Sequence, residues 1–149
     1  MSLDHHFLCF PQEWTEKLVR FQRAYMSDGE FIRYRAFSDV PRPIDPDADD
    51  FAGKYLMDYY MANKKNAISV HDRIILKNLR RFASVDTFFI GFIPCVGLNY
   101  YGLTLIPWES LPEFVDVIKK IPKNSEANKL RALGQEAYIN HEDILHCGI

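Results

Sequence analysis

The segment over residues 85–93 constrains the fold of this 149-residue chain most strongly, because both of its alternating sets of positions are mostly apolar. One set contains Val85, Phe89 and Ile93, and the other contains Phe88, Ile90 and Phe92. Successive side chains of a strand point to opposite faces of a sheet, so this pattern is typical of a strand covered on both faces. We therefore expect a strand at the centre of a sheet, with Phe89 almost fully buried.

Five other segments carry apolar residues at the three-to-four-residue spacing of amphipathic helices. Residue types that favour a helix start mark their predicted beginnings, at Pro11, at Asp49 or Asp50, and at Ser69, Ser110 and Ser125. Three prolines exclude regular structure from about residue 39 to about residue 49. Shorter strands are predicted over residues 30–37, 100–106 and 143–149, with a hairpin loop at residues 94–99.

These elements predict an α+β fold. We expect a mixed or antiparallel sheet of three to five strands, packed by four to five helices. The chain length is close to the commonest domain size, and 48% of its residues are hydrophobic, so residues 1–149 are expected to form a single domain.

Charge is segregated along the chain. Residues 39–50 contain five aspartates and one arginine, whereas residues 54–81 contain seven basic and two acidic residues. The net charge of the whole chain is only −2. Adjacent patches of opposite sign steer charged partners without a strong overall field, so this pattern favours a protein that binds another macromolecule.

Two surfaces are therefore candidates for partner binding. The first is the acidic segment with the tyrosines that follow it, which contains Asp45, Asp47, Asp49, Asp50, Tyr59 and Tyr60. The second is the basic side of the helix predicted after Ser69, which carries Arg73, Lys77, Arg80 and Arg81. A sequence pI near 6.2 argues against nucleic acid as the partner of either surface.

Cysteine usage and the apolar runs bear on the cell compartment. Cys9, Cys95 and Cys147 are odd in number and widely spaced, which argues against a disulfide framework. The longest apolar runs fall far below the roughly 18 residues of a membrane span, and the N-terminus lacks the pattern of a secretory signal. The expected location is the cytoplasm, without a membrane partner.

Candidate catalytic and metal-binding groups lack a supporting motif. Residues 45–50 resemble the start of a calcium loop, but Asp50 stands where the loop requires glycine. His146 and Cys147 would point to opposite faces of a strand, and the N-terminal group of His5, His6 and Cys9 lacks the spacing of a metal motif. We expect no intrinsic catalysis, no cofactor and no metal.

Residues 86–121 contain T-F-F-I-G-F, then N-Y-Y-G-L-T-L-I-P, then W-E-S-L-P-E-F-V-D-V-I, in the predicted order of strand, hairpin, strand and proline-capped helix. This block resembles small bacterial immunity proteins, the cytoplasmic partners of polymorphic and contact-dependent growth-inhibition toxins. The closing D-I-L-H-C-G-I adds a strand in the same style. These families share no catalytic signature, so no family residue is carried over to this chain.

The resemblance implies a protein that neutralises a cognate toxin by binding it. Many such toxins are basic nucleases, for which an aspartate-rich segment could imitate a phosphate backbone. Two alternatives stay open. One is a small cytoplasmic enzyme whose site is assembled from distant residues such as His71, His141, His146 and Cys147, in a deep cleft. The other is a general protein-interaction module.

Overall fold

The computed structural model describes residues 3–16, 47–89 and 93–149. The helix predicted from Pro11 begins as expected, with helical residues 12–16. The remainder of that helix and the strand predicted over residues 30–37 lie outside the described residues.

The described strands form one six-stranded sheet in which every pairing is antiparallel. The strands are β1 (Asp4–Phe10), β2 (Ile68–His71), β3 (Asp86–Phe89), β4 (Ile93–Val96), β5 (Leu103–Ile106) and β6 (Asp143–Cys147). Their order is β2-β1-β6-β5-β3-β4. The α+β class is confirmed, and the sheet has one strand more than the upper limit that we expected.

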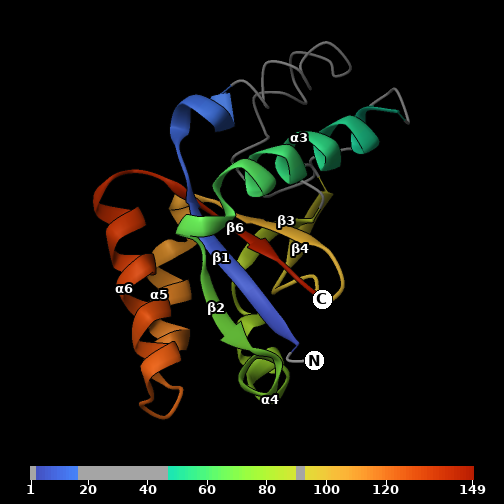
Figure 1. The fold of residues 1–149 in the computed structure, drawn as a ribbon. Coiled ribbons are helices and arrows are strands. Elements are labelled where there is room, and N and C mark those ends of the chain that lie inside the picture. The colour runs from blue at the N-terminus through green and yellow to red at the C-terminus, as the bar shows by residue number, and fades with distance from the viewer. Residues whose placement is uncertain (1–2, 17–46, 90–92) are drawn as a thin grey trace.

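Helices lie on both faces of this sheet (Figure 1). They are α3 (Asp47–Asn63), α4 (Asp72–Phe82), α5 (Leu111–Lys119) and α6 (Ser125–Ile139), with 3-10 turns η2 (Lys64–Asn66) and η3 (Trp108–Ser110). Helix α3 packs on one face through Leu56 and Tyr59. Helices α4, α5 and α6 pack on the other face, where Phe82, Phe114 and Leu130 are fully buried.

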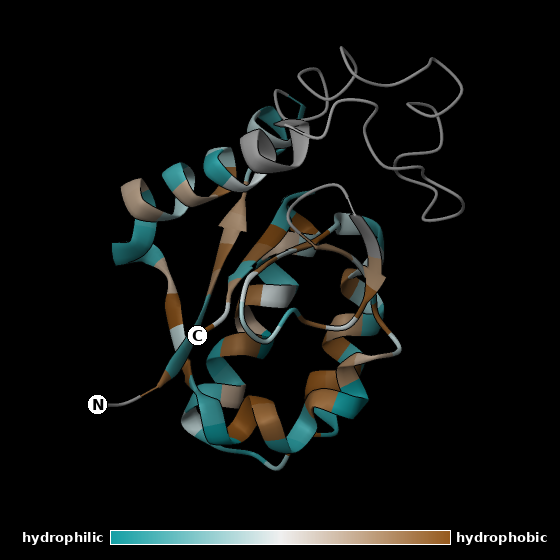
Figure 2. Cartoon of the chain, turned by 90° about the vertical axis from the view of Figure 1, so that its right-hand side faces the viewer, coloured by the Kyte–Doolittle hydropathy of each residue, from teal (hydrophilic) through white to brown (hydrophobic). Residues whose placement is uncertain are grey.

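Side chains of β1 point alternately to the two faces of the sheet, and each face has its own hydrophobic core. Phe7 contributes to the core under α4, α5 and α6, and Leu8 and Phe10 contribute to the core under α3. Strand ribbons in Figure 2 are therefore largely hydrophobic, whereas the helices alternate hydrophobic and hydrophilic residues along their length. This pattern fits strands buried on two faces and helices buried on one.

The prediction of a single central strand over residues 85–93 is wrong. Residues 86–89 form β3 and residues 93–96 form β4, and the two strands pair with each other, with Phe89 opposite Ile93. Strand β3 is next to the edge strand β4, and Phe88 rather than Phe89 is fully buried. Because both sets of positions stay mostly apolar from residue 85 to residue 93, periodicity could not separate the two strands.

Two predicted helix starts have different capping residues, and a third lacks the capping hydrogen bond. Ser69 lies in β2, and His71 caps α4 by accepting a hydrogen bond from Arg73 N. Asn124, not Ser125, caps α6, because its side chain accepts from Ala127 N. Ser110 precedes α5 as expected, but its side chain makes no capping hydrogen bond.

The N-terminal strand β1 was missed by the sequence analysis, although it pairs with both β2 and β6. Its polar start, Asp4 to His6, obscured the alternation that continues through Phe7 to Phe10. The terminal strand predicted over residues 143–149 is confirmed as β6. Among the described helices, none combines the length and apolar character needed to cross a bilayer.

Candidate functional site

The acidic residues of the first candidate surface mark the beginning of α3. Asp47, Asp49 and Asp50 lie in its first turn, and Asp45 lies outside the described residues. The helix therefore starts before the predicted capping position, and the expectation of irregular structure up to residue 49 is corrected. Acidic residues are favourable there because the N-terminal end of a helix carries partial positive charge.

The two tyrosines of the same candidate surface lie in different environments. Tyr59 is a core residue, only 7% exposed, whose hydroxyl donates to the carbonyl oxygen of Cys9 at 2.9 Å. Burial raises the pKa of Tyr59 to about 12. Tyr60 is half-buried, and its ring lies 5.9 Å from the ring of His6. Tyr59 thus cannot anchor a partner without leaving the core.

The outer side of α3 instead exposes two methionines. Met57 is 38% exposed and Met61 is 54% exposed. Residues four apart lie on the same side of a helix, so the two side chains are neighbours. Lys54 and Asp58 are also exposed on this helix. The outer face of α3, defined here by Lys54, Met57, Asp58 and Met61, therefore joins an apolar pair to charged residues.

The second candidate surface lies on α4, where all four predicted basic residues are exposed. They are Arg73, Lys77, Arg80 and Arg81. Arg81 reaches α5 and donates through Nη1 to the carbonyl oxygen of Lys120 at 2.6 Å. The first turn of α3 and helix α4 lie at opposite ends of the molecule in Figure 1. The charge segregation along the sequence is therefore also a separation in space.

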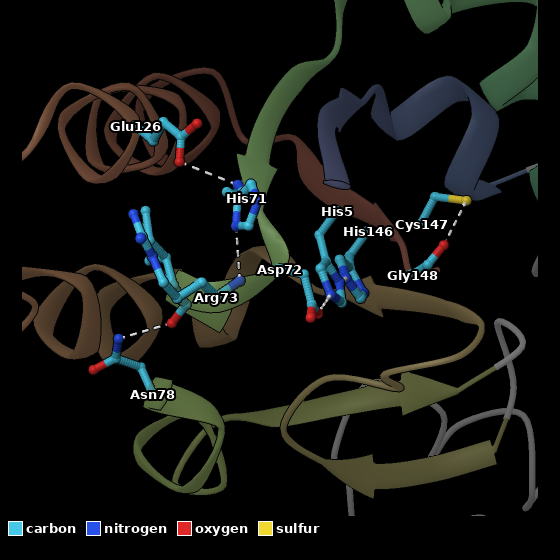
Figure 3. Close-up of polar contacts among 10 residues, drawn as sticks. His5, His71, Asp72, Arg73, Asn78, Glu126, His146, Cys147 and Gly148 are labelled. Atoms are coloured by element: carbon cyan, nitrogen blue, oxygen red, sulfur yellow. Dashed lines mark hydrogen bonds and ion pairs between the residues drawn. The ribbon is translucent and has the colours of Figure 1, made fainter. Parts of the chain in front are cut away.

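A hollow of about 630 Å³ separates the first half of α4 from the start of α6. Its lining residues are His71, Arg73, Ile74, Lys77, Asn78, Ile121, Pro122, Asn124, Ser125 and Glu126. Arg73 and Lys77 line this hollow, whereas Arg80 and Arg81 lie outside its lining. The carboxylate of Glu126 accepts a hydrogen bond from the backbone N–H of His71 at 3.1 Å (Figure 3).

A buried chain of hydrogen bonds crosses the sheet beside α4. His5 Nε2 lies 3.0 Å from Asp72 Oδ1, and His5 Nδ1 lies 2.9 Å from His146 Nε2 (Figure 3). His146 Nδ1 lies 3.1 Å from Thr104 Oγ1, which accepts from the backbone N–H of Asn99. With both rings neutral, every donor meets an acceptor, because Asp72 accepts from His5 and Thr104 donates to His146.

Burial and hydrogen bonding shift the pKa values of three groups in this network. Burial, with smaller contributions from His5 and His6, holds the pKa of His146 well below its ordinary value of 6.5. A hydrogen bond from Tyr100, followed by one from His5, lowers the pKa of Asp72. The same bond to Asp72 raises the pKa of Tyr100 to about 12. The side chains of His5, His146 and Thr104 are 0% exposed, so a substrate cannot reach these three members of the hydrogen-bond network.

The residues suggested for an enzyme site do not meet in one cleft. His71 lines the hollow between α4 and α6, and His146 lies inside the sheet. His141 is exposed, and its ring stacks on the ring of Trp108 with a centroid separation of 4.6 Å. Cys147 packs against the core under α3, so His146 and Cys147 lie on opposite faces, as we predicted.

The cysteines that the structure describes are free thiols in partly buried positions. Burial, reinforced by Glu142 and Glu136, raises the pKa of Cys9 to about 12, and burial also raises that of Cys147. A thiol with a raised pKa is a poor nucleophile at neutral pH. Within residues 3–16, 47–89 and 93–149, no group of three or more His, Cys, Asp or Glu side chains is placed to hold a metal ion.

Comparison with protein-family models, with curated proteins and with solved structures finds no match to this chain.

Proposed function

We propose that this protein neutralises a bacterial toxin by binding it, as an immunity protein, and that the outer face of α3 contacts the toxin. The observation that carries the proposal is the exposed pair Met57 and Met61, on the helix that begins with Asp47, Asp49 and Asp50. Apolar contacts inside a rim of charges are the usual composition of a protein–protein interface.

Each part of this surface has a physical role in binding. Methionine is flexible and polarisable, so Met57 and Met61 can fit closely against an apolar patch of the toxin. The aspartates favour a basic partner and accelerate encounter through long-range attraction. This division predicts that methionine changes act on the dissociation rate and aspartate changes act on the association rate and its salt dependence.

Binding rather than catalysis is supported by the positions of the chemically versatile groups. His5 bonds to both His146 and Asp72, whereas His141 stacks on Trp108. The basic side chains of α4, in contrast, are exposed. The basic face of Arg73, Lys77, Arg80 and Arg81 remains the second candidate for the toxin contact.

The test is growth protection in a bacterium that produces this chain together with the protein encoded directly upstream of its gene, which the proposal expects to be the toxin. The unaltered chain should restore growth, and the double variant Met57→Ala with Met61→Ala should protect poorly at equal protein level. Leu76→Ala is the matched control, because Leu76 is 56% exposed on α4, away from the proposed face. It should protect fully.

Two results would contradict the proposal. Growth arrest that is unchanged by the unaltered chain would remove the immunity function itself. Full protection by the methionine variant, together with loss of protection on neutralising Arg73, Lys77, Arg80 and Arg81, would move the interface to α4.

A further inference from the structure

The hollow between α4 and α6 has two cations that lack acidic partners. Arg73 and Lys77 are one helical turn apart, and both side chains are exposed at its wall. Among the described residues, neither forms an ion pair. Arginine and lysine one turn apart can contact the same oxyanion, because residues four apart share a side of the helix.

The opposite wall supplies free peptide N–H groups. Asn124 caps α6 and satisfies the N–H of Ala127 at 2.8 Å, and the first helical hydrogen bond runs from Asn128 N to Asn124 O. The N–H groups of Ser125 and Glu126 therefore have no acceptor in the described part of the chain. Such a helix start favours anions through its N–H groups and its partial positive charge.

A buried amide adds an acceptor to this lining. Asn78 is only 6% exposed, and its side chain donates to the carbonyl oxygen of Ile74 at 2.8 Å. A carbonyl oxygen can only accept, so the bonded atom must be Nδ2, and Oδ1 is the atom left over. Figure 3 shows this oxygen directed away from the bonded carbonyl. No described group donates to it, which leaves it open to a donor on a ligand.

We propose that this hollow binds a phosphate monoester that also carries a hydroxyl group, such as a sugar phosphate. Arg73, Lys77 and the N–H groups at the start of α6 hold the phosphate, and Asn78 Oδ1 accepts from the hydroxyl. The side chains of Ile74, Ile121 and Pro122 line the same hollow and pack against the carbon skeleton. Its volume of about 630 Å³ falls within the range of small-molecule sites.

Glu126 limits the affinity of this site and provides a test of it. It is the one acidic residue of the lining, and its bond to His71 N holds the carboxylate at the wall. Glu126→Gln removes the negative charge and keeps an oxygen that can accept from His71 N. The change should therefore strengthen phosphate binding, a result that a purely structural role for Glu126 does not produce.

The experiment is a calorimetric and NMR titration of the full chain with ribose 5-phosphate, with inorganic phosphate and ribose as separate arms. Ribose 5-phosphate should bind tightest and ribose should not bind. Arg73→Gln or Lys77→Gln should each raise Kd about tenfold or more, since each removes a charged hydrogen bond. Glu126→Gln should lower Kd about threefold.

The matched control is Arg80→Gln, which removes the same charge from the same helix outside the lining of the hollow. It should change Kd less than about twofold.

An equal loss of affinity in Arg80→Gln and Arg73→Gln would mean diffuse electrostatic attraction and would overturn the site. Equal binding of inorganic phosphate and ribose 5-phosphate would overturn the role of Asn78, and unmoved Ser125 and Glu126 amide signals would overturn the phosphate contact. Toxin binding is a separate proposal, and none of these three results affects it.

Discussion

His146 couples the stability of the fold to pH. Its pKa is held well below 6.5 in the folded protein, so the folded state resists a proton that the unfolded chain accepts. The resulting stability is fully present above about pH 6.5 and is lost as pH falls toward the folded-state pKa. For one such group the loss is at most about 1.4 kcal/mol per pH unit.

We predict that His146→Gln lowers the free energy of unfolding by about 1 to 3 kcal/mol at neutral pH, because the bonds to His5 and Thr104 are disturbed. The variant should also lose less stability than the unaltered protein between about pH 7.5 and about pH 5.5. Urea unfolding at several pH values measures both effects.

His141→Gln is the control for that experiment. His141 is exposed and its ring stacks on the ring of Trp108, so His141→Gln removes a histidine and leaves the bonds of His146 to His5 and Thr104 in place. Identical pH dependence in His146→Gln and the unaltered protein would contradict the assignment of His146 as the buried neutral group.

The sequence did not predict the hydrogen bonds that His5 makes with His146 and Asp72. The separations along the chain are 141 residues between His5 and His146 and 67 between His5 and Asp72. No local spacing brings such residues together, because strand order decides which of them meet. The local prediction for His146 and Cys147 is confirmed, since opposite orientation follows from strand geometry alone.

Among the secondary-structure elements, β3 gives the sharpest test of the register. Phe88 is 0% exposed and faces the core under α3, whereas Phe89 is only partly buried. Phe88→Ala should therefore cost about 3 to 5 kcal/mol of unfolding free energy. Phe89→Ala should cost clearly less.

Chemical denaturation of both phenylalanine variants checks this prediction. The reverse order, with Phe89→Ala as the more damaging change, would restore the burial of Phe89 that the sequence suggested. It would also contradict the pairing of Phe89 with Ile93.

Helices were easier to predict than strands for a physical reason. The spacing of apolar residues in α4, α5 and α6 is a local signal, and it placed all three helices within a few residues. Strand pairing is not local. The sequence analysis therefore missed the pairing of β3 with β4 and the polar beginning of β1.

At the scale of the whole molecule, charge is the feature that connects sequence to proposed function. The acidic first turn of α3 and the basic face of α4 lie far apart in Figure 1, although only about twenty residues separate them along the chain. The sequence predicted both charged surfaces. It did not predict the burial of Tyr59 or the exposure of Met57 and Met61, because both depend on which side of α3 meets the sheet.

The central claim, that the outer face of α3 binds a toxin, is tested most directly by calorimetric titration of this chain with the protein encoded directly upstream of its gene, which the proposal expects to be the toxin. The account predicts a one-to-one complex that weakens about tenfold or more when Met57 and Met61 become alanine. Asparagine at Asp45, Asp47, Asp49 and Asp50 should reduce the salt dependence of binding. The same affinity and salt dependence in the unaltered protein and in both variants would contradict the claim.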